Sequence, residues 1–353
     1  MDQEIKHNNE IRVAADALQT FAREVFDRVG LPPQDAALAA EVLVWANVRG
    51  IDSHGVLRIP QYLDYVKRRL MNPRPNVQII RETPAVLFMD ADRAFGPIAT
   101  VPAMKQAITK ARRVGIGWAL IRNVTHQGAL GYYALLAAAQ GMVGLAIVCG
   151  TPNMAPFGAK ARGLHNSPIA IAAPAGQHRP LVLDMATSIA AGGKLTLASD
   201  QGTPLPQGWA LDADGNPTTD ADQAQILLPA GAYKGSGLAL MFQCLTSIIA
   251  GNPLVTPTLQ GQDLGHNQNS VVAAIDIGLF TALEGFRQSV DEHIDGIKSL
   301  PKADGLDDIL VPGEPEHDKL KERLRYGIPL PPGTVEKLRE VARRFRLNLP
   351  AGL

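Results

Sequence analysis

The sequence predicts an α/β fold: one large mixed sheet flanked by helices, and a helical unit formed by the N-terminal and C-terminal segments. Three observations predict it. Residues 11–72 carry apolar positions at helical spacing, residues from about 77 onward alternate short apolar runs with helical segments, and helical patterns return after residue 316. The 353 residues also allow several structural units, because single cores stop growing before that length.

The first predicted unit, residues 1–76, is helical. Apolar residues recur every three to four positions from Ile11 to Phe26, and a second helix opens at Pro32 and Pro33, since proline suits a first helical turn. A third helix is predicted to begin between Val56 and Pro60, because proline is tolerated only near a helix start.

The second predicted unit, residues 77–299, is the mixed α/β part. Its apolar runs predict strands at 85–90, 116–124, 143–150, 167–174, 180–187 and 270–277, with helices over 97–115 and 129–141 and a turn at 212–216. The third segment, residues 300–353, carries helices near 316–325 and 332–346, which are expected to return to the N-terminal helices.

Charge and composition favour a small-molecule partner. The 34 basic residues are balanced by 34 acidic ones, which argues against a nucleic-acid or anionic-membrane binder. The polar start lacks the apolar segment of a signal peptide, and the uncharged stretch 238–250 is too short to span a bilayer. Cys149 and Cys244 lie in apolar segments, which predicts two buried thiols in a reducing, cytoplasmic compartment.

Several familiar ligand motifs are missing. The nearest approach to G-x-G-x-x-G, at Gly235 and Gly237, lacks the third glycine, so a Rossmann-type dinucleotide site is not predicted. No phosphate loop occurs, since Gly192, Gly193 and Lys194 are followed by leucine. Neither H-E-x-x-H nor paired cysteines offer a metal site, so no metal is predicted.

The first candidate cluster contains Ser53, His54, Arg58 and Tyr62. Arg58 and Tyr62 stand four residues apart on one helix face, and an arginine fork can bind a carboxylate through two hydrogen bonds. His54 titrates near neutral pH and suits proton transfer during a carbonyl to hydroxyl conversion, with Ser53 orienting its ring. The alternative makes Ser53 a helix cap and His54 a surface residue.

The second cluster, residues 125–133, follows a predicted strand and precedes a predicted helix, where open α/β sheets place their ligands. Gly128 allows close backbone approach, the helix amides can hold a cofactor pyrophosphate, and His126 would face the reactive centre. The alternative is a glycine that serves only the turn.

Two further positions are ambiguous from residue chemistry alone. Asp184, at a strand end, can accept a hydrogen bond from a ligand or cap the following helix. Lys234 opens an apolar helix, where a cation opposes the helix dipole and is better explained by an anionic ligand than by helix stability. Simple solvent exposure of Lys234 is the alternative.

A series of segments resembles one known family over nearly the whole chain. SHGVLRIPQY, THQGALGYY, PNMAPFGAKARGLHNSPIAIAAP, LDMATS, GWALDADGNPT, LLPAGAYKGSGLAL and VPGEPE, in this order, resemble the malate/L-lactate dehydrogenase family, which is unrelated to Rossmann-type dehydrogenases. Its members include ureidoglycolate dehydrogenase, 2,3-diketogulonate reductase, sulfolactate dehydrogenase and Δ1-piperideine-2-carboxylate reductase. The resemblance implies a mixed-sheet nucleotide-binding unit of non-Rossmann type, a nicotinamide cofactor (NAD or NADP) and a homodimer.

The resemblance also implies residue roles. Proton transfer falls to His54 beside Ser53, or to His126, and Arg58 binds the substrate carboxylate with Tyr62 on the same face. Asn166 stands in 165–168, where many members read G-T-N-P and the threonine contacts substrate. The implied cofactor contacts are His126, Gln127, Gly128, Ala129, Leu130, Asp184, Met185, Ala186, Lys234, Gly235, Pro312, Gly313 and Glu314.

The leading hypothesis is an NAD(P)-dependent oxidoreductase that interconverts a small 2-oxo acid and a 2-hydroxy acid by hydride transfer. Reduction of a cyclic or N-alkyl 2-imino acid is the close alternative, because the same carboxylate clamp and proton donor serve both reactions. A nicotinamide-binding regulatory protein without activity is the second alternative, since fold resemblance does not guarantee function. Residue spacing does not distinguish NADH from NADPH.

Overall fold

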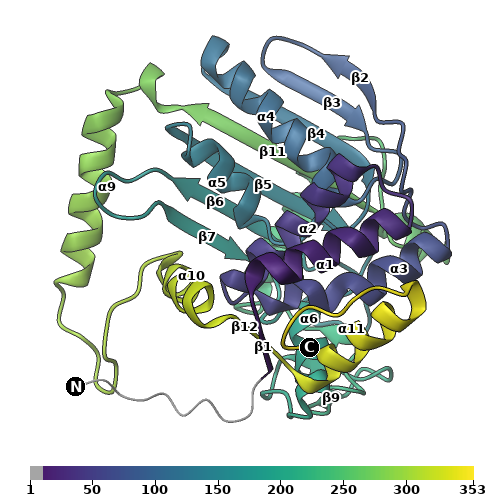
Figure 1. Cartoon of the computed structure of the whole chain (residues 1–353). Helices are drawn as coiled ribbons and strands as arrows, with labels where there is room; N and C mark the ends of the chain where they lie inside the picture. Colours follow the sequence, from purple (N-terminus) through teal and green to yellow (C-terminus); the bar gives the residue numbers. More distant parts are fainter. Residues whose placement is uncertain (1–10) are drawn as a thin grey trace.

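The computed structural model describes residues 11–353, so the first ten residues of the predicted helical unit lie outside the described part. At its centre is a seven-stranded sheet in the order β2-β3-β4-β11-β5-β6-β7 (Figure 1). Its strands are β2 (Gln78–Glu82), β3 (Val86–Asp90), β4 (Ile116–Val124), β5 (Met142–Gly150), β6 (Ile169–Ala173), β7 (Leu181–Met185) and β11 (Gln268–Asp276). Only β3 and β4 pair in parallel, and the other neighbours are antiparallel. The predicted mixed sheet is therefore confirmed.

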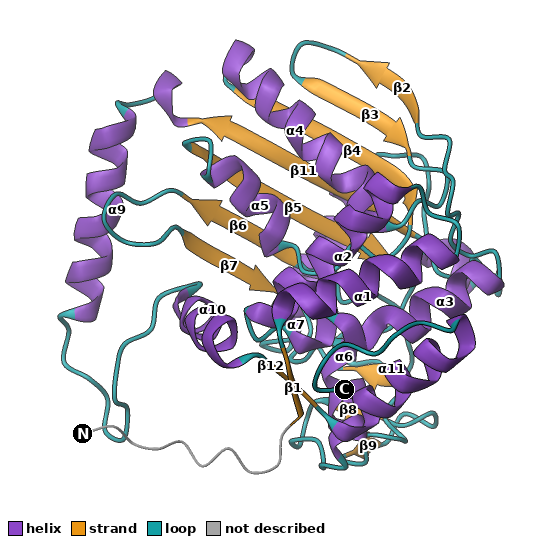
Figure 2. Ribbon diagram, in the orientation of Figure 1, coloured by secondary structure: helices purple, strands orange, loops and turns teal. Residues whose placement is uncertain are grey.

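Two helices cover one face of this sheet, α4 (Gly96–Val114) and α5 (Gly131–Ala138) (Figure 2). Glycines allow them to lie directly on the strands. A Cβ at Gly117 of β4 would lie 1.8 Å from the carbonyl oxygen of Ala107, and a Cβ at Gly144 of β5 would lie 2.1 Å from that of Ala134. Any larger residue there would push α4 or α5 off the sheet.

The opposite face is covered by α7 (Tyr233–Gln243) and a π-helical turn, Cys244–Ile248, which contact β4, β5 and β11. Phe242 packs there on Cys149 and Val271. Cys149 is buried as predicted, but Cys244 is exposed, so the prediction of two buried thiols is wrong for Cys244.

The two ends of the chain share a second core. It contains α1 (Ala15–Arg28), α2 (Pro33–Val48), α3 (Ile59–Lys67) and α11 (Pro332–Phe345). The third helix begins inside the predicted interval, and the expected return of the C-terminal segment is observed. Helix was predicted from Ile11, whereas the structure has a short strand, β1 (Ile11–Val13), because β12 (Ile328–Leu330) offers it an antiparallel partner.

The remaining elements surround these two cores. A small sheet contains β8 (Ala210–Leu211), β9 (Pro217–Thr218) and β10 (Ile226–Leu227), and the predicted turn at 212–216 joins its first two strands. The remaining helices are α6 (Gly192–Gln201), α8 (Val255–Leu259), α9 (Leu283–Lys298) and α10 (Glu314–Tyr326). None of the helices in the described range 11–353 is long and apolar enough to cross a membrane.

Candidate functional site

A cavity of about 1020 Å³ lies where the helical core meets the edge of the large sheet. Its walls come from four places in the sequence: 45–54 at the end of α2, 128–139 along α5, 179–191 along β7, and 310–320 at the start of α10. The lining is completed by Asn166, Pro168, Lys194, Leu197 and Ala230. Segments far apart in the chain thus converge on one space large enough for an extended ligand.

Ser53 and His54 stand on a tight 3-10 turn, Asp52–His54, at the cavity wall. The turn is held from behind by Asn47, whose amide donates to Asp52 Oδ1 at 2.7 Å and accepts from the Val56 backbone N–H at 2.8 Å. A Cβ at Gly55 would lie 2.1 Å from Asn47 Oδ1, so the turn requires glycine there. Arg323 of α10 donates two hydrogen bonds to Asp52, at 2.6 and 2.8 Å.

The predicted pairing of Ser53 with His54 is present, since Ser53 Oγ lies 2.9 Å from His54 Nδ1. This contact fixes the ring through one nitrogen and leaves Nε2 for another partner. Burial lowers the pKa of His54 to about 3, and the positive charge of Arg58 contributes. The imidazole is therefore neutral at pH 7 in the unliganded protein.

Arg58 is a partly buried cation without an anionic neighbour. Its Nε donates to the Ser53 carbonyl and its Nη1 to Gln61 Oε1, both at 2.8 Å. Across residues 11–353, no carboxylate lies within ion-pair distance of its guanidinium. Burial lowers its pKa, as expected for a desolvated charge that lacks a counter-ion. Such a group is ready to receive an anion.

His126 lies beside these residues. Its ring stacks on that of His54 with centroids 5.5 Å apart. Nδ1 accepts a hydrogen bond from the Gly128 backbone N–H at 3.3 Å, and the Tyr62 hydroxyl lies 2.7 Å from the same nitrogen. Because a backbone N–H can only donate, the neutral ring carries its proton on Nε2. Burial lowers the pKa of His126, and Arg58 and His54 lower it further.

A third histidine, His266, completes this group and was not predicted. Its ring stacks on Tyr65 at 4.5 Å and lies 6.2 Å from the ring of His126. Its Nε2 is buried without a hydrogen-bond partner among the described residues. Burial lowers its pKa to about 4, with a contribution from Arg58. Its position just before a predicted strand was the only sequence feature that could have pointed to it. It lies far along the chain from the other clusters.

Asp184 of β7 directs its carboxylate to the start of α5. Its Oδ2 accepts a hydrogen bond from the Gly131 backbone N–H at 2.7 Å. Asp184 is reached by solvent through the cavity, yet surrounding protein atoms desolvate its carboxyl and raise its pKa to about 6, with a contribution from Glu316. One of the backbone amides at this helix start, where a cofactor pyrophosphate was predicted, therefore already donates to a carboxylate.

Many of the predicted residues are brought together. Those that line the cavity are Ser53, His54, Gly128, Ala129, Leu130, Asn166, Asp184, Met185, Ala186, Pro312 and Gly313. Arg58 and His126 lie next to the cavity lining, because Arg58 bonds the Ser53 carbonyl and the His126 ring stacks on that of His54. Tyr62, expected beside the substrate, contacts His126 through its hydroxyl. The Pro312 carbonyl accepts from the Val182 N–H at 3.0 Å, which seats residues 312–313 along β7.

Gln127 and Gly235 serve packing. The Gln127 side chain is buried and its Oε1 accepts from Thr100 Oγ1 at 2.8 Å, so it points into the core instead of the cavity. Gly235 is buried where a Cβ would lie 2.2 Å from the Thr187 carbonyl oxygen. The Gln127 side chain cannot reach a ligand in the cavity without a rearrangement of these contacts.

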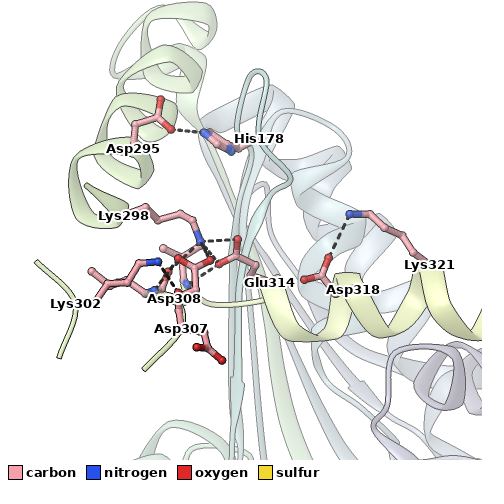
Figure 3. Close-up of polar contacts among 11 residues, drawn as sticks. His178, Asp295, Lys298, Lys302, Asp307, Asp308, Glu314, Asp318 and Lys321 are labelled. Atoms are coloured by element: carbon pink, nitrogen blue, oxygen red, sulfur yellow. Dashed lines mark hydrogen bonds and ion pairs between the residues drawn. The ribbon is translucent and has the colours of Figure 1, made fainter. Parts of the chain in front are cut away.

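Lys234 and Glu314 also lie outside the cavity lining. Lys234 is exposed at the start of α7. The Glu314 carboxylate accepts from Lys298 Nζ at 2.8 and 2.9 Å, and the same amine bonds Asp308 at 2.9 Å (Figure 3). Through Lys298, Glu314 thus ties the start of α10, and with it the segment between α9 and α10, to the end of α9.

The cavity suits a nicotinamide dinucleotide, although the chain lacks the glycine motif of Rossmann-type sites. Its volume of about 1020 Å³ and its walls, which combine apolar side chains with a few polar groups, suit a dinucleotide. Gly128 to Leu130, Asp184 to Ala186 and Pro312 to Gly313 are the residues placed to hold such a group.

The chain is similar to known proteins over most of its length. The family described as malate/L-lactate dehydrogenase matches residues 13–339. The chain is 37% identical to the malate dehydrogenase of Pyrococcus horikoshii over 95% of this chain and 96% of that protein, and 36% identical to the L-sulfolactate dehydrogenase of Methanocaldococcus jannaschii over 98% of each. It is 30% identical to the ureidoglycolate dehydrogenase (NAD(+)) of Escherichia coli O157:H7 over 91% of this chain and 93% of that protein.

Solved structures give the same result. The malate dehydrogenase structure from Pyrococcus horikoshii superposes with a TM-score of 0.87, at 36% identity over 97% of each chain. A Δ1-piperideine-2-carboxylate reductase structure from Pseudomonas syringae superposes with a TM-score of 0.80, at 28% identity, covering 94% of this chain and 99% of that one. The chain therefore belongs to the malate/L-lactate dehydrogenase family.

Proposed function

We propose that this dehydrogenase interconverts a small 2-oxo acid and the corresponding 2-hydroxy acid with NAD or NADP. One observation carries the proposal: Arg58 has no carboxylate partner in the described chain and lies against two stacked imidazoles, His54 and His126. A substrate carboxylate would supply the missing counter-ion. The carbonyl or hydroxyl carbon next to that carboxylate would then lie beside the imidazoles.

Arg58 is held in position for this task. Its contacts with the Ser53 carbonyl and Gln61 use Nε and Nη1, and no hydrogen-bond partner is found for Nη2 among residues 11–353. A Cβ at Gly193 would lie 2.4 Å from Nη2, so glycine at this position leaves room around the guanidinium. The planar fork gives directional recognition of a carboxylate that a lysine cannot reproduce.

His54 or His126 handles the proton. In the neutral state assigned above, Nε2 of His126 can donate to a carbonyl oxygen as it becomes a hydroxyl, and in the reverse direction it can accept the hydroxyl proton. Arg58 is one cause of the lowered pKa values of both rings. A bound carboxylate offsets this positive charge, so we expect it to raise both pKa values toward neutrality.

The dinucleotide, when bound in the cavity, supplies or accepts the hydride. The protein positions the acid, excludes water and moves the proton. The relatives named malate, L-sulfolactate and ureidoglycolate dehydrogenase support a 2-hydroxy acid as the substrate class.

Reduction of a cyclic or N-alkyl 2-imino acid is the second candidate. It is favoured by the structural likeness to a Δ1-piperideine-2-carboxylate reductase and by the lowered pKa values of His54, His126 and His266. Three neutral rings add no positive charge beside a protonated imine, whereas the Arg58 clamp would serve its carboxylate equally well.

A turnover screen separates these candidates. Small 2-oxo acids are offered with NADH and with NADPH, each with and without an alkylamine, and cyclic 2-imino acids are offered alone. We expect oxo-acid turnover without amine and oxidation of the matching 2-hydroxy acid. Efficient imine turnover without oxo-acid activity would favour the second candidate. Tight nicotinamide binding without any turnover would support a regulatory protein instead.

The proposed enzyme is a cytoplasmic homodimer. Exposed apolar side chains gather on α7 and its π-helical turn, and apolar patches of this kind mark protein interfaces. They are Leu238, Leu240, Met241, Leu245, Ile248 and Ile249. Two free cysteines agree with a reducing compartment. Size-exclusion chromatography with light scattering should give twice the mass of one chain, and a monomer would contradict the dimer.

A further inference from the structure

Three basic side chains line one part of the cavity and have no role in the proposed chemistry. They are Arg49 at the end of α2, Arg179 just before β7, and His317 in the first turns of α10. Arg49 lies over the Trp45 ring at 4.2 Å, which holds its guanidinium against the cavity wall. Three separate segments thus direct positive or titratable nitrogen groups into one space.

These side chains lack anionic partners. Within residues 11–353, neither arginine nor His317 makes an ion pair with a carboxylate. The charges around His317 act on its pKa: burial lowers it, the positive charges of Arg179, Lys321 and Arg49 lower it further, and the negative charge of Asp318 raises it. Like charges gathered without a counter-ion destabilise the empty protein and favour a bound anion.

The acidic groups nearby are accounted for. Asp318 is paired with Lys321 at 3.2 Å on the exposed side of α10 (Figure 3). Glu316 lines the cavity, but its charge acts on Asp184 at the start of α5 and is not among the causes of the His317 shift. The basic group therefore keeps a net positive charge toward the cavity.

The position of Arg179 identifies which end of a dinucleotide it would meet. The Met185 end of β7 leads into α6. Gly193 of α6 lies against Ser53, since a Cβ there would be 2.5 Å from the Ser53 carbonyl oxygen. The Met185 end of β7 is therefore the end near the catalytic residues. Arg179 precedes the other end. Five residues of extended strand separate it from Asp184 by roughly 15 Å. A cofactor with its reactive ring near His54 would carry its adenosine toward Arg179.

We propose that Arg49, Arg179 and His317 form an anion subsite for the 2′-phosphate of NADP, so that the protein prefers NADP(H) to NAD(H). The inference rests on the proposed nicotinamide function. Sites for the unphosphorylated ribose place a carboxylate on its hydroxyls, whereas sites for the 2′-phosphate place arginine there. Two guanidiniums offer the geometry that phosphate oxygens need, and His317 adds a third nitrogen group.

The test is cofactor binding, read by nucleotide fluorescence in the absence of any acid substrate. Arg179 is exposed, so Arg179→Ala should fold normally, and the exposed Arg113→Ala on α4 is the matched control. We expect Arg179→Ala to weaken NADPH binding by about tenfold or more, the size of one lost charge-assisted hydrogen bond, and to leave NADH binding within about twofold. The same variant should weaken binding of adenosine 2′,5′-bisphosphate, which carries the 2′-phosphate, and leave binding of ADP, which lacks it, nearly unchanged.

Two outcomes would overturn the proposal. An equal loss of affinity for NADPH and NADH would show that the basic group binds the pyrophosphate. Unchanged affinities for both cofactors would show that these residues form no anion subsite. The result is separable from the proposed reaction. NADPH binding that depends on Arg179 without turnover of any acid leaves the subsite standing and rejects the reaction, whereas turnover with an unaffected Arg179→Ala variant rejects the subsite alone.

Discussion

The hydroxyl of Tyr62 lies 2.7 Å from Nδ1 of His126, and the two residues are 64 positions apart in the chain. Tyr62 comes from the helical core and His126 from the segment between β4 and α5, so this contact joins the two halves of the site. Burial raises the pKa of Tyr62, which keeps its proton on the phenol. The phenol can therefore donate to Nδ1 and hold the His126 ring with Nε2–H available to the substrate.

Tyr62→Phe should lower kcat on the order of tenfold with little change in cofactor affinity, because it frees the His126 ring but keeps the aromatic packing on Phe95. Steady-state kinetics and nucleotide titration measure both effects. Tyr326→Phe, at the end of α10, is the control and should behave as the wild type. An unchanged kcat in Tyr62→Phe would show that the ring needs no such support.

Arg58→Lys should raise the KM for the acid by roughly tenfold to a hundredfold with a smaller change in kcat, because a point charge replaces a two-pronged donor. The exposed Arg68→Lys, ten residues further along the chain, is the matched control. Equal KM values for the two variants would remove Arg58 from substrate binding.

The buried histidines should make the protein sensitive to acid. Burial lowers the pKa of His54 and of His165 to about 3 and that of His266 to about 4, whereas an unfolded imidazole titrates near pH 6.5. Unfolding therefore takes up protons below that pH. The stability from these neutral rings is complete above about pH 6.5 and is lost as the pH falls toward 3.

Denaturant midpoints measured from about pH 7.5 to about pH 4.5 check this expectation. His165→Gln should reduce the slope of stability against pH, since one proton fewer is taken up on unfolding. The exposed His293→Gln on α9 is the matched control. A midpoint that stays constant across this pH range would contradict the neutral, buried state of the histidines.

Glu314→Gln should increase hydrogen exchange several-fold in residues 299–313, because Lys298 would lose its carboxylate partner on α10 (Figure 3). Cofactor affinity should change little if Glu314 acts only through this tie. Asp318→Asn, which breaks an exposed pair one turn further along α10, should leave exchange in that segment unchanged. A large loss of cofactor affinity with unchanged exchange would restore Glu314 as a direct contact.

Local sequence patterns predicted the parts of the site that local structure builds. Ser53, His54 and Arg58 stand within six residues on consecutive turns, so their spacing in the chain already fixes their closeness in space. His266 and Tyr62 meet His126 only through the packing of distant elements, which periodicity cannot reveal. The basic residues of the proposed anion subsite are dispersed for the same reason.

Motif resemblance placed residues near the site but did not give the directions of their side chains. Gln127 follows His126 directly, yet successive side chains in an extended segment point to opposite sides, and Gln127 faces the core. The sheet was predicted because its buried strands are nearly continuous apolar runs. The exposed β2 lacks such a run and was missed, and α9 was missed although its apolar residues recur at helical spacing.

The most direct test of the central claim compares kcat/KM for a 2-hydroxy acid with that for its primary amide, which keeps the heavy-atom shape of the carboxylate but replaces one oxygen by NH2 and carries no charge. The account predicts that the wild type prefers the acid by a factor on the order of a hundred and that Arg58→Met abolishes most of this preference. A wild-type enzyme that uses acid and amide equally well would contradict the proposal that Arg58 binds the substrate carboxylate.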